Sequence, residues 1–340
     1  MQARNKQTYA LAGVNIGVAN KIKKFIAQEA KTTFHPEVLN FGSFGSLFQL
    51  KGYEEPVLVS SVDGVGTKLK IAALLGKNDT VGIDLVNHCV NDILCCGASP
   101  LFFLDYIAMD KLNTEQVKSI VTGIVWACRE VNCSLVGGEI AEMPGIYSPE
   151  NYDLVGFIIG VVEKRGIIDG SSIVSGDVAL GLPSSGLHTN GYSLVRRIFG
   201  IDDDPSHLYE FYPQLGKTLG EELLMPHRCY YHELKPVLSL IKGLAHITGG
   251  GCEGNIPRIL PEGLGVHIDR NSWDMPPIFK LIQQRGNIDE GEMYRVFNMG
   301  IGMVAICSSQ DALKIIEALP QARVIGEIIK AERKERIKID

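Results

Sequence analysis

Residues 57–75 read VLVSSVDGVGTKLKIAALL, and two kinds of hydrophobic periodicity follow one another in this stretch. The β-branched run at residues 57–62 is typical of a buried strand, and it ends in the turn sequence Asp63-Gly64. Apolar residues then recur with helical spacing from residue 67 to residue 75. The stretch therefore predicts a strand, a glycine turn and a helix.

The segments that follow continue this alternation of helices and strands. Residues 81–96 predict a helix, which ends before a glycine and a proline. Residues 114–131 predict another helix, with Thr114 placed to cap it. A Gly, Ser and Asp-rich passage at residues 164–177 is the best candidate for a linker. Strands are expected at residues 101–109, 134–136, 154–162, 178–182, 244–248, 265–268 and 299–307, and further helices near residues 192–199, 230–242 and 278–284. The pattern predicts two α/β halves.

Length and composition limit the class of protein. At 340 residues the chain exceeds one ordinary domain of roughly 100 to 200 residues, so two domains are expected. A net charge of −6 offers no basic surface to a nucleic acid. The longest apolar run, residues 154–162, is too short to span a bilayer, and the polar start of the chain lacks the apolar core of a signal peptide. We therefore expect a cytoplasmic protein that binds neither membranes nor nucleic acids.

The eight cysteines do not form a metal-binding pattern. No Cys-x-x-Cys occurs, and Cys89, Cys95 and Cys96 lie in an apolar helical stretch. Unpaired cysteine packs as a small apolar residue. The sequence therefore predicts buried free thiols.

Glycine-rich loops beside polar residues suggest phosphate binding. Residues 63–68 place a carboxylate at a strand end, then bare backbone, then a hydroxyl and an ammonium at a helix start, a set suited to Mg²⁺ and polyphosphate. An ordinary capped turn would use the same residues. No Walker sequence occurs, so ATP would bind without that loop. Similar glycine loops stand at residues 41–46, 137–139, 186–191 and 248–251.

Gly249-x-Gly251-x-x-Gly254 matches the dinucleotide-binding fingerprint on paper. The helix that this fold requires would have to contain Pro257 and Pro261, which leave no room for a crossover helix of normal length. An anion-binding turn at a short helix is the better interpretation.

Two further side chains are candidates for the site. His188 lies between glycines in a loop, which favours a functional role over that of a core histidine. Glu139 follows two glycines at a strand end, where ligands often meet sheets.

Taken together and in order, these motifs resemble one family. They comprise residues 63–68, Asn91-Asp92 with Gly97-Ala98, residues 100–106, residues 137–145, residues 186–194, residues 246–251 and residues 298–302. Across essentially the whole chain they are similar to the phosphoribosylformylglycinamidine cyclo-ligase family. Single motifs recur in selenophosphate synthetase, thiamine-phosphate kinase, a hydrogenase maturation protein and formylglycinamidine synthetase. The full set of motifs, and especially residues 101–106 and 142–145, is specific to the cyclo-ligase.

The resemblance implies a mixed α/β (α+β) fold of two domains. An N-terminal domain, residues 1–168, would bind ATP and dimerise through its sheet, and residues 169–340 would form a C-terminal α+β domain. It also implies that ATP and Mg²⁺ serve the cyclisation of formylglycinamidine ribonucleotide to aminoimidazole ribonucleotide. By resemblance, the metal ligands are Asp63, Asp92 and Glu139, and the remaining nucleotide-binding residues are Gly64, Gly66, Thr67, Lys68 and Asn91. His188 and Asn190 would lie near the reacting groups, and Thr248, Gly249, Gly250 and Gly251 are weaker candidates for a phosphate cradle.

The chain departs from the family pattern at three positions. Ile140 and His227 stand where Thr is usual, and Thr189 where Ser is usual. Ile140 removes a polar group beside Glu139.

Two other interpretations remain. A sister kinase or selenophosphate synthetase shares the phosphate loops, but the latter would need a reactive cysteine that residues 41–46 lack. A nucleotide-binding scaffold without turnover would have no need to keep Asp63, Asp92, Glu139 and His188 together.

Overall fold

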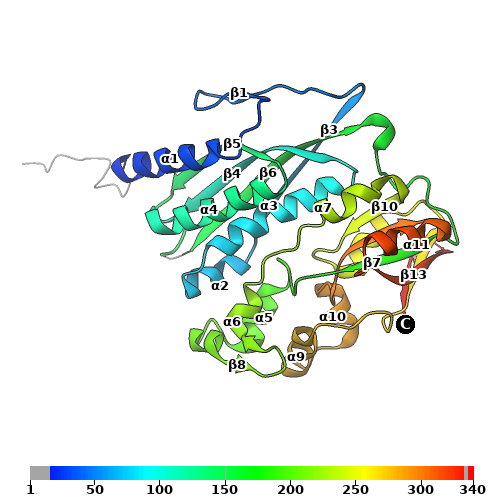
Figure 1. Cartoon of the computed structure of the whole chain (residues 1–340). Helices are drawn as coiled ribbons and strands as arrows, with labels where there is room; N and C mark the ends of the chain where they lie inside the picture. Colours follow the sequence, from blue (N-terminus) through cyan, green and yellow to red (C-terminus); the bar gives the residue numbers. More distant parts are fainter. Residues whose placement is uncertain (1–15, 150, 333–335) are drawn as a thin grey trace, which may run out of the picture.

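The computed structural model describes residues 16–149, 151–332 and 336–340. These residues form one four-stranded and one six-stranded sheet with helices packed against them (Figure 1). The mixed α/β class predicted from the sequence is confirmed. No helix in the described ranges is long and apolar enough to cross a membrane.

The first sheet has the strand order β3-β6-β4-β5. Its β4 and β5 strands run parallel, and β6 is antiparallel to both of its neighbours. The predicted strands are confirmed within two residues at each end except β5, which is longer than predicted because Gly137 and Gly138 remain in the ladder. The strands are β3 (Pro56–Gly64), β4 (Ser99–Met109), β5 (Ser134–Glu142) and β6 (Tyr152–Glu163), and a separate hairpin consists of β1 (Val38–Asn40) and β2 (Leu47–Phe48).

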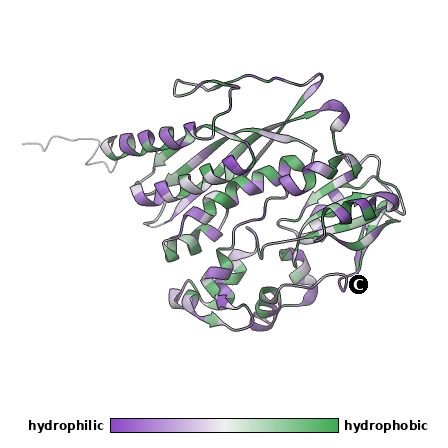
Figure 2. Ribbon diagram, in the orientation of Figure 1, coloured by the Kyte–Doolittle hydropathy of each residue, from purple (hydrophilic) through white to green (hydrophobic). Residues whose placement is uncertain are grey.

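Helices cover one face of this sheet. Helix α3 packs on β3, β4 and β6, while α1 and α4 lie towards β5 (Figure 1). Gly82 and Gly123 allow α3 and α4 to approach closely, because a Cβ at either position would overlap the backbone of the other helix. Figure 2 shows hydrophilic and hydrophobic residues alternating around α1, as expected for a helix with one face on the protein. The helices are α1 (Ile16–Lys31), α2 (Lys68–Leu75), α3 (Asp79–Leu94) and α4 (Thr114–Glu130).

The cap of α4 differs from the prediction. Asn113, not Thr114, is the N-cap residue, and its Oδ1 accepts hydrogen bonds from the backbone N–H groups of Glu115 and Gln116, both at 3.1 Å. Asn is at least as good a cap as Thr, so the cap lies one residue earlier than predicted, and Thr114 is the first residue of the helix.

The second sheet has the order β10-β12-β7-β13-β11-β14. Every residue of its strand β12 is buried, as expected for a strand inside a sheet that is covered on both faces. The strands are β7 (Val178–Pro183), β10 (Ile241–His246), β11 (Leu264–Ile268), β12 (Ile301–Cys307), β13 (Arg323–Lys330) and β14 (Ile337–Ile339), with a small hairpin of β8 (Phe211–Tyr212) and β9 (Lys217–Thr218). The helices are α5 (Tyr192–Phe199), α6 (Leu219–Leu223), α7 (Tyr231–Leu234), α8 (Gly251–Asn255), α9 (Pro277–Gly286), α10 (Glu290–Val296) and α11 (Ser309–Ala318).

One predicted helix of this half is wrong. Instead of a helix at residues 230–242, α7 is followed by a 3₁₀ segment, Lys235–Leu240, and β10 begins at Ile241. Pro236 lacks the N–H that an α-helix would need there. Shorter 3₁₀ segments occur at Lys164–Gly166, Pro205–Tyr209 and Ile256–Ile259.

Polar residues of α3 join the two halves. The Asp84 carboxylate accepts from the backbone N–H of His227 at 2.6 Å, and Asn87 donates to the carbonyl of the same residue at 2.7 Å. Asn91 donates to the Arg228 carbonyl at 2.8 Å and accepts from the Tyr230 N–H at 3.0 Å. These buried side chains form hydrogen bonds with backbone N–H and C=O groups of residues 227–230, which lie outside regular secondary structure. This explains why the buried helix α3 carries so many polar side chains.

Candidate active site

Asp63 and Asp92 reach the same small region, as predicted. Asp63 lies near the end of β3 and Asp92 in the last turn of α3, and each carboxylate pairs with a histidine. Asp63 Oδ2 lies 2.9 Å from His88 Nε2, and Asp92 Oδ1 lies 2.9 Å from His246 Nδ1. Burial opposes ionisation of both acids, but their histidine partners more than offset it, so both pKa values are lowered. Both carboxylates are therefore charged, and their side chains keep 44% and 28% of their surface exposed.

Four histidines from separate segments meet beside these acids. The rings of His188 and His227 stack with centroids 3.9 Å apart. His88 lies 5.2 Å from His227 and 5.0 Å from His246, and the last two lie 5.0 Å from each other. Burial, followed by neighbouring cationic groups, holds the pKa values of His188 and His227 well below their usual range. In His88 the Asp63 hydrogen bond and charge outweigh burial and raise the pKa.

His188 is held in a strained position. Its φ is +59°, in the left-handed region that non-glycine residues rarely occupy, and its side chain is buried rather than open to solvent. The ring Nε2 accepts from the Ser185 N–H at 3.1 Å, so the neutral ring carries its proton on Nδ1, which has no partner. Gly302 gives the ring room, because a Cβ there would overlap it. A buried, unpaired N–H in a strained loop is typical of functional positions.

Lys68 does not lie where the sequence suggested. Its side chain is fully buried, and the ammonium contacts Asp84 at 2.8 Å and the carbonyls of His188 and Met225 at 3.3 Å and 2.7 Å. Burial lowers the pKa of Lys68, and the Asp84 charge opposes that shift. All three donors of the ammonium have protein acceptors in this structure, so Lys68 does not face a ligand here, and its phosphate contact stays a prediction. Lys68 instead fixes the loop that contains His188.

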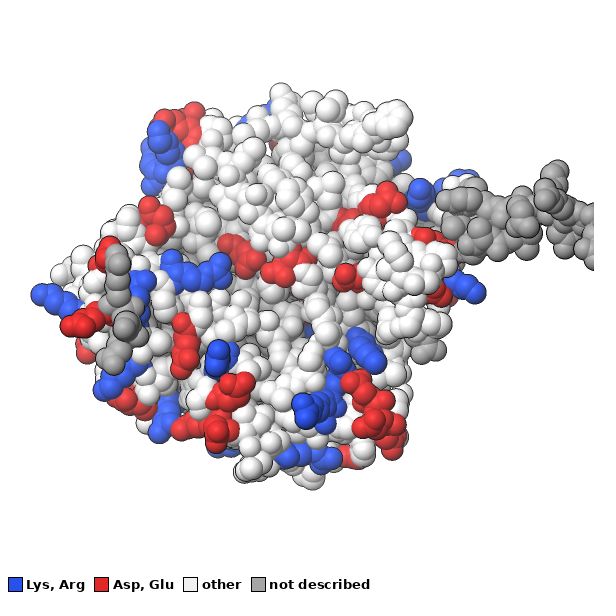
Figure 3. Space-filling model, turned by 180° about the vertical axis from the view of Figure 1, so that it is seen from behind, with Lys and Arg blue, Asp and Glu red and all other residues white. Residues whose placement is uncertain are grey.

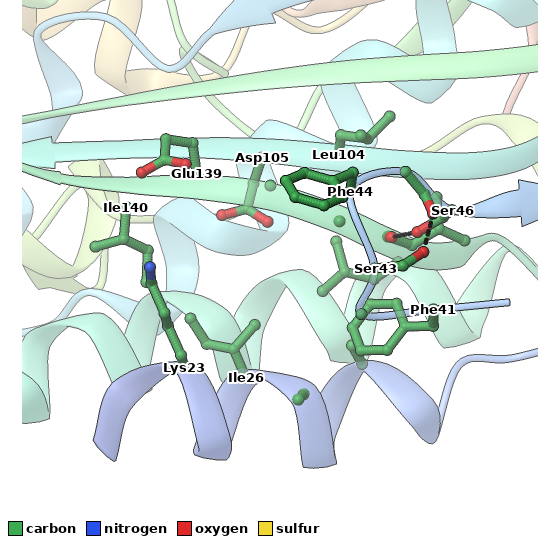
Figure 4. A pocket seen from close by; sticks show the side chains of 18 residues that line it. Lys23, Ile26, Phe41, Ser43, Phe44, Ser46, Leu104, Asp105, Glu139 and Ile140 are labelled. Atoms are coloured by element: carbon green, nitrogen blue, oxygen red, sulfur yellow. Dashed lines mark hydrogen bonds between the residues drawn. The ribbon is translucent and has the colours of Figure 1, made fainter. Parts of the chain in front are cut away.

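Glu139 is separated from the other two acids. It lies on β5 at one edge of the four-stranded sheet, whereas Asp63 lies on β3 at the opposite edge, with β6 and β4 between them. Glu139 and Ile140 line a cavity of about 560 Å³ between α1, the glycine loop at residues 41–46 and β5. Figure 4 shows the Asp105 carboxylate pointing into this cavity and Lys23 reaching across from α1. Burial raises the pKa of Asp105 to about 7.

The other nucleotide-binding candidates divide between the surface and the interior. Thr67 precedes α2, and its hydroxyl lies 3.0 Å from that of Ser193. Gly66 has a φ of +70°, which explains glycine there, and Gly64 donates its N–H to Asp63 Oδ1 at 2.7 Å. Asn91 is completely buried and holds the backbone of the other half, so it does not face a ligand in this structure.

Asn190 and the loop at residues 248–251 lie close together within the second half of the chain. A Cβ placed on Gly249 would lie 3.2 Å from Asn190 Oδ1. Asn255 donates to the carbonyls of Thr248, Gly249 and Gly251, and this holds the loop in shape. The helix that follows, α8, ends at Asn255, as the prolines beyond it require.

Sequence reasoning gave no role to most of the histidine cluster or to Asp105. His88 lies in a helix interpreted as apolar, and His227 was noted only as a departure. His246 stood in a matching motif without an assigned function. All eight cysteines are free, and Cys95, Cys96 and Cys229 are partly rather than fully buried, so the prediction of buried thiols is only partly confirmed.

Two family models match most of the chain. The family described as "AIR synthase related protein, N-terminal domain" matches residues 48–162, and "AIR synthase related protein, C-terminal domain" matches residues 174–339. Among solved structures, thiamine-monophosphate kinase from Stenotrophomonas maltophilia superposes with a TM-score of 0.65 at 13% identity, covering 96% of each chain. Hydrogenase maturation protein HypE in complex with ATP superposes with a TM-score of 0.63 at 15% identity, covering 93% of this chain and 88% of HypE. These two share the fold.

Sequence relatives are much closer. The phosphoribosylformylglycinamidine cyclo-ligase of Caldicellulosiruptor bescii is 53% identical, covering 96% of this chain and 98% of the relative. The protein of the same name from Acetivibrio thermocellus is 53% identical, covering 95% of this chain and 97% of the relative. The chain therefore belongs to the phosphoribosylformylglycinamidine cyclo-ligase family.

Proposed function

We propose that this protein catalyses the ATP-dependent closure of the imidazole ring in purine biosynthesis. The substrate is formylglycinamidine ribonucleotide, and the products are aminoimidazole ribonucleotide, ADP and phosphate. The observation that carries the proposal is the meeting of Asp63, Asp92 and the His188 loop at the junction of the two halves, in a chain 53% identical to named cyclo-ligases. Incubation with ATP, Mg²⁺ and the amidine nucleotide should give ADP and aminoimidazole ribonucleotide in equal amounts.

The chemistry requires activation of a poor leaving group. An amide oxygen does not leave unaided, so transfer of the γ-phosphoryl group to the formyl oxygen produces an imidate. The amidine nitrogen then attacks the same carbon, and the C–O bond to the phosphate breaks. The protein's contribution is to position the two substrates and to neutralise charge on the transferred group.

The residues present fit ATP and Mg²⁺. Mg²⁺ takes oxygen ligands and usually one or two carboxylates besides the phosphates, and Asp63 and Asp92 are charged and partly exposed. Glu139 would act from the cavity at residues 41–46, whose volume of about 560 Å³ lies in the range of small-molecule sites. When bound, the metal would neutralise phosphate charge. The ATP complex of HypE supports nucleotide binding by this fold.

His188 would act as a hydrogen-bond donor. Its neutral ring carries the free N–H on Nδ1, and an opening of its loop would direct that donor to a formyl or phosphoryl oxygen. His188→Ala is therefore expected to lower turnover about 10²-fold or more. His188→Asn is the matched control for backbone strain, because Asn tolerates the left-handed conformation. Full activity with a lower melting temperature in both variants would assign His188 to the core instead.

We also propose that the chain forms a homodimer through the uncovered face of the first sheet. Val62 on β3 lies opposite Phe157 on β6, which lies opposite Leu104 on β4. Leu58 lies four residues before Val62, on the same face of β3. The exposed fractions are 62% for Val62, 61% for Leu58 and 40% for Phe157. Seen from behind, the upper part of the molecule is largely uncharged, with acidic side chains in a band below it (Figure 3). An apolar sheet face of this kind typically binds a partner.

Charge on this face should separate the protomers. Val62→Lys would place an ammonium in the apolar contact, where it lacks a partner, so the dissociation constant is expected to rise at least about tenfold. Trp126→Lys is the control, since Trp126 is 51% exposed on α4 over the opposite face. Sedimentation would measure both masses. A monomeric wild type, or an unchanged dimer in Val62→Lys, contradicts the proposal.

As an enzyme of purine synthesis acting on a small ribonucleotide, the protein would work in the cytoplasm.

A further inference from the structure

Two imidazoles stand directly against the two acids of the site. His88 directs Nε2 to Asp63, and His246 directs Nδ1 to Asp92. One ligand atom each of His88, Asp92 and His246 lies within 4.8 Å of the other two, which is close enough for a single cation to bind all three after small shifts. The side chains of both histidines are at most 7% exposed, so the group is held by its surroundings.

The second nitrogen of each ring is already engaged away from the acids. His88 Nδ1 lies 3.0 Å from the Thr189 hydroxyl, and His246 Nε2 lies 2.9 Å from His227 Nε2. Without a cation, the N–H groups of His88 Nε2 and His246 Nδ1 face the acids. A bound cation would favour the tautomers in which each ring donates its proton to the other partner, which leaves lone pairs on the side of the acids. Histidines that bind metals are oriented in this way, with the other ring N–H fixed by a neighbouring acceptor.

His227 has the properties of such an orienting acceptor. It is buried, and its Nδ1 has no partner, so the ring can carry its proton there while Nε2 accepts from His246. Asp63 adds a second carboxylate beside His88. The donor set is therefore two imidazole nitrogens and one or two carboxylates.

We propose that His88, Asp92 and His246, beside Asp63, bind a transition-metal dication of the Mn²⁺, Co²⁺ and Zn²⁺ class in preference to Mg²⁺. Mg²⁺ takes oxygen ligands almost exclusively, whereas imidazole with carboxylate suits the transition metals, whose affinity rises along that series. This inference rests on the proposed function in one respect: the proposed function alone would assign Asp63 and Asp92 to Mg²⁺ only. The cation binds without nucleotide.

The test is a titration of metal-free protein with Co²⁺, followed by calorimetry and visible absorption. Wild type should bind one equivalent at least about 10²-fold more tightly than Mg²⁺. His88→Gln and His246→Gln should each weaken Co²⁺ binding about 10- to 100-fold while Mg²⁺ affinity changes little. His207→Gln is the matched control, because His207 also pairs with a carboxylate, Glu210, but on the surface and away from the site.

Wild-type protein alone also tests the site if a variant fails to fold. X-ray absorption of protein loaded with one Zn²⁺ should show two imidazole ligands and no sulfur. Co²⁺ bound no more tightly than Mg²⁺, equal Co²⁺ affinity in both histidine variants, or thiolate ligation would each overturn the proposal. Co²⁺ bound at the cluster without any ring closure would refute the proposed function alone, and ring closure without Co²⁺ binding would refute this inference alone.

Discussion

Asp63→Asn and Asp92→Asn are each expected to lower ATP turnover about 10²- to 10³-fold, or about 3 to 4 kcal/mol of transition-state stabilisation. Both acids are charged and partly exposed, and Asp63 pairs with His88, whose Nδ1 contacts Thr189 in the His188 loop. Asn keeps the shape of the side chain and its hydrogen-bond acceptor but loses the charge that neutralises phosphate and metal. Steady-state turnover at several Mg²⁺ concentrations measures the effect, and added metal should recover part of the loss.

A second acid of the same helix provides the control for Asp92. Asp79 lies in the first turn of α3, where its charge favours the helix by about 0.3 to 1 kcal/mol, far from the histidines. Asp79→Asn should therefore change melting temperature slightly and leave turnover intact. Unchanged turnover in both Asp63→Asn and Asp92→Asn would end their assignment to the metal and nucleotide.

Lys68→Met should destabilise the fold by about 3 to 5 kcal/mol, because it leaves the Asp84 charge buried without its partner. It also removes the donor that the carbonyls of His188 and Met225 share. Lys68→Met with Asp84→Asn should recover much of the loss, since Asn carries no charge and still accepts from the His227 N–H. Urea unfolding of the single and double variants gives both free energies.

If Lys68 contacts a phosphate of ATP instead, the Lys68→Met variant should behave differently. In that case Lys68→Met would raise the KM for ATP with little change in unfolding free energy. Lys70→Met is the matched control: Lys70 lies on the same helix, is 43% exposed and approaches Asp202 only at 3.5 Å, so its loss should cost less than about 0.5 kcal/mol.

Local pattern was sufficient for three strands of the first sheet and for the long helices α3 and α4, but α1, α11 and β13 were not predicted. The strands β3, β6 and β12 are long β-branched or apolar runs bounded by turn residues, and all three were predicted within two residues. The error at residues 230–242 arose because apolar spacing there is compatible with both a helix and a 3₁₀ turn that leads into a strand. The strand β5 continued through Gly137 and Gly138 because its neighbour β4 supplies the ladder, and a single segment does not show that partner.

The site was less accessible to sequence reasoning because it is assembled from distant segments. Asp63 and Asp92 could be placed from a strand end and a helix end, but His88, His227 and His246 become neighbours only when α3, the segment after α6 and β10 pack together. Lys68 looked exposed at the start of a helix, and only the position of Asp84 sixteen residues later explains its burial. Glu139 shares a sheet with Asp63, yet the strand order places the two at opposite edges.

The most direct test of the account is the dependence of phosphate release from ATP on the second substrate. With Mg²⁺ present, release should require formylglycinamidine ribonucleotide, and each phosphate should be matched by one aminoimidazole ribonucleotide. Thiamine monophosphate and selenide, the substrates of the sister enzymes, should give only the background rate. Equal ATP turnover with either of them, or turnover with the amidine nucleotide that yields no imidazole, would contradict ring closure as the function of this protein.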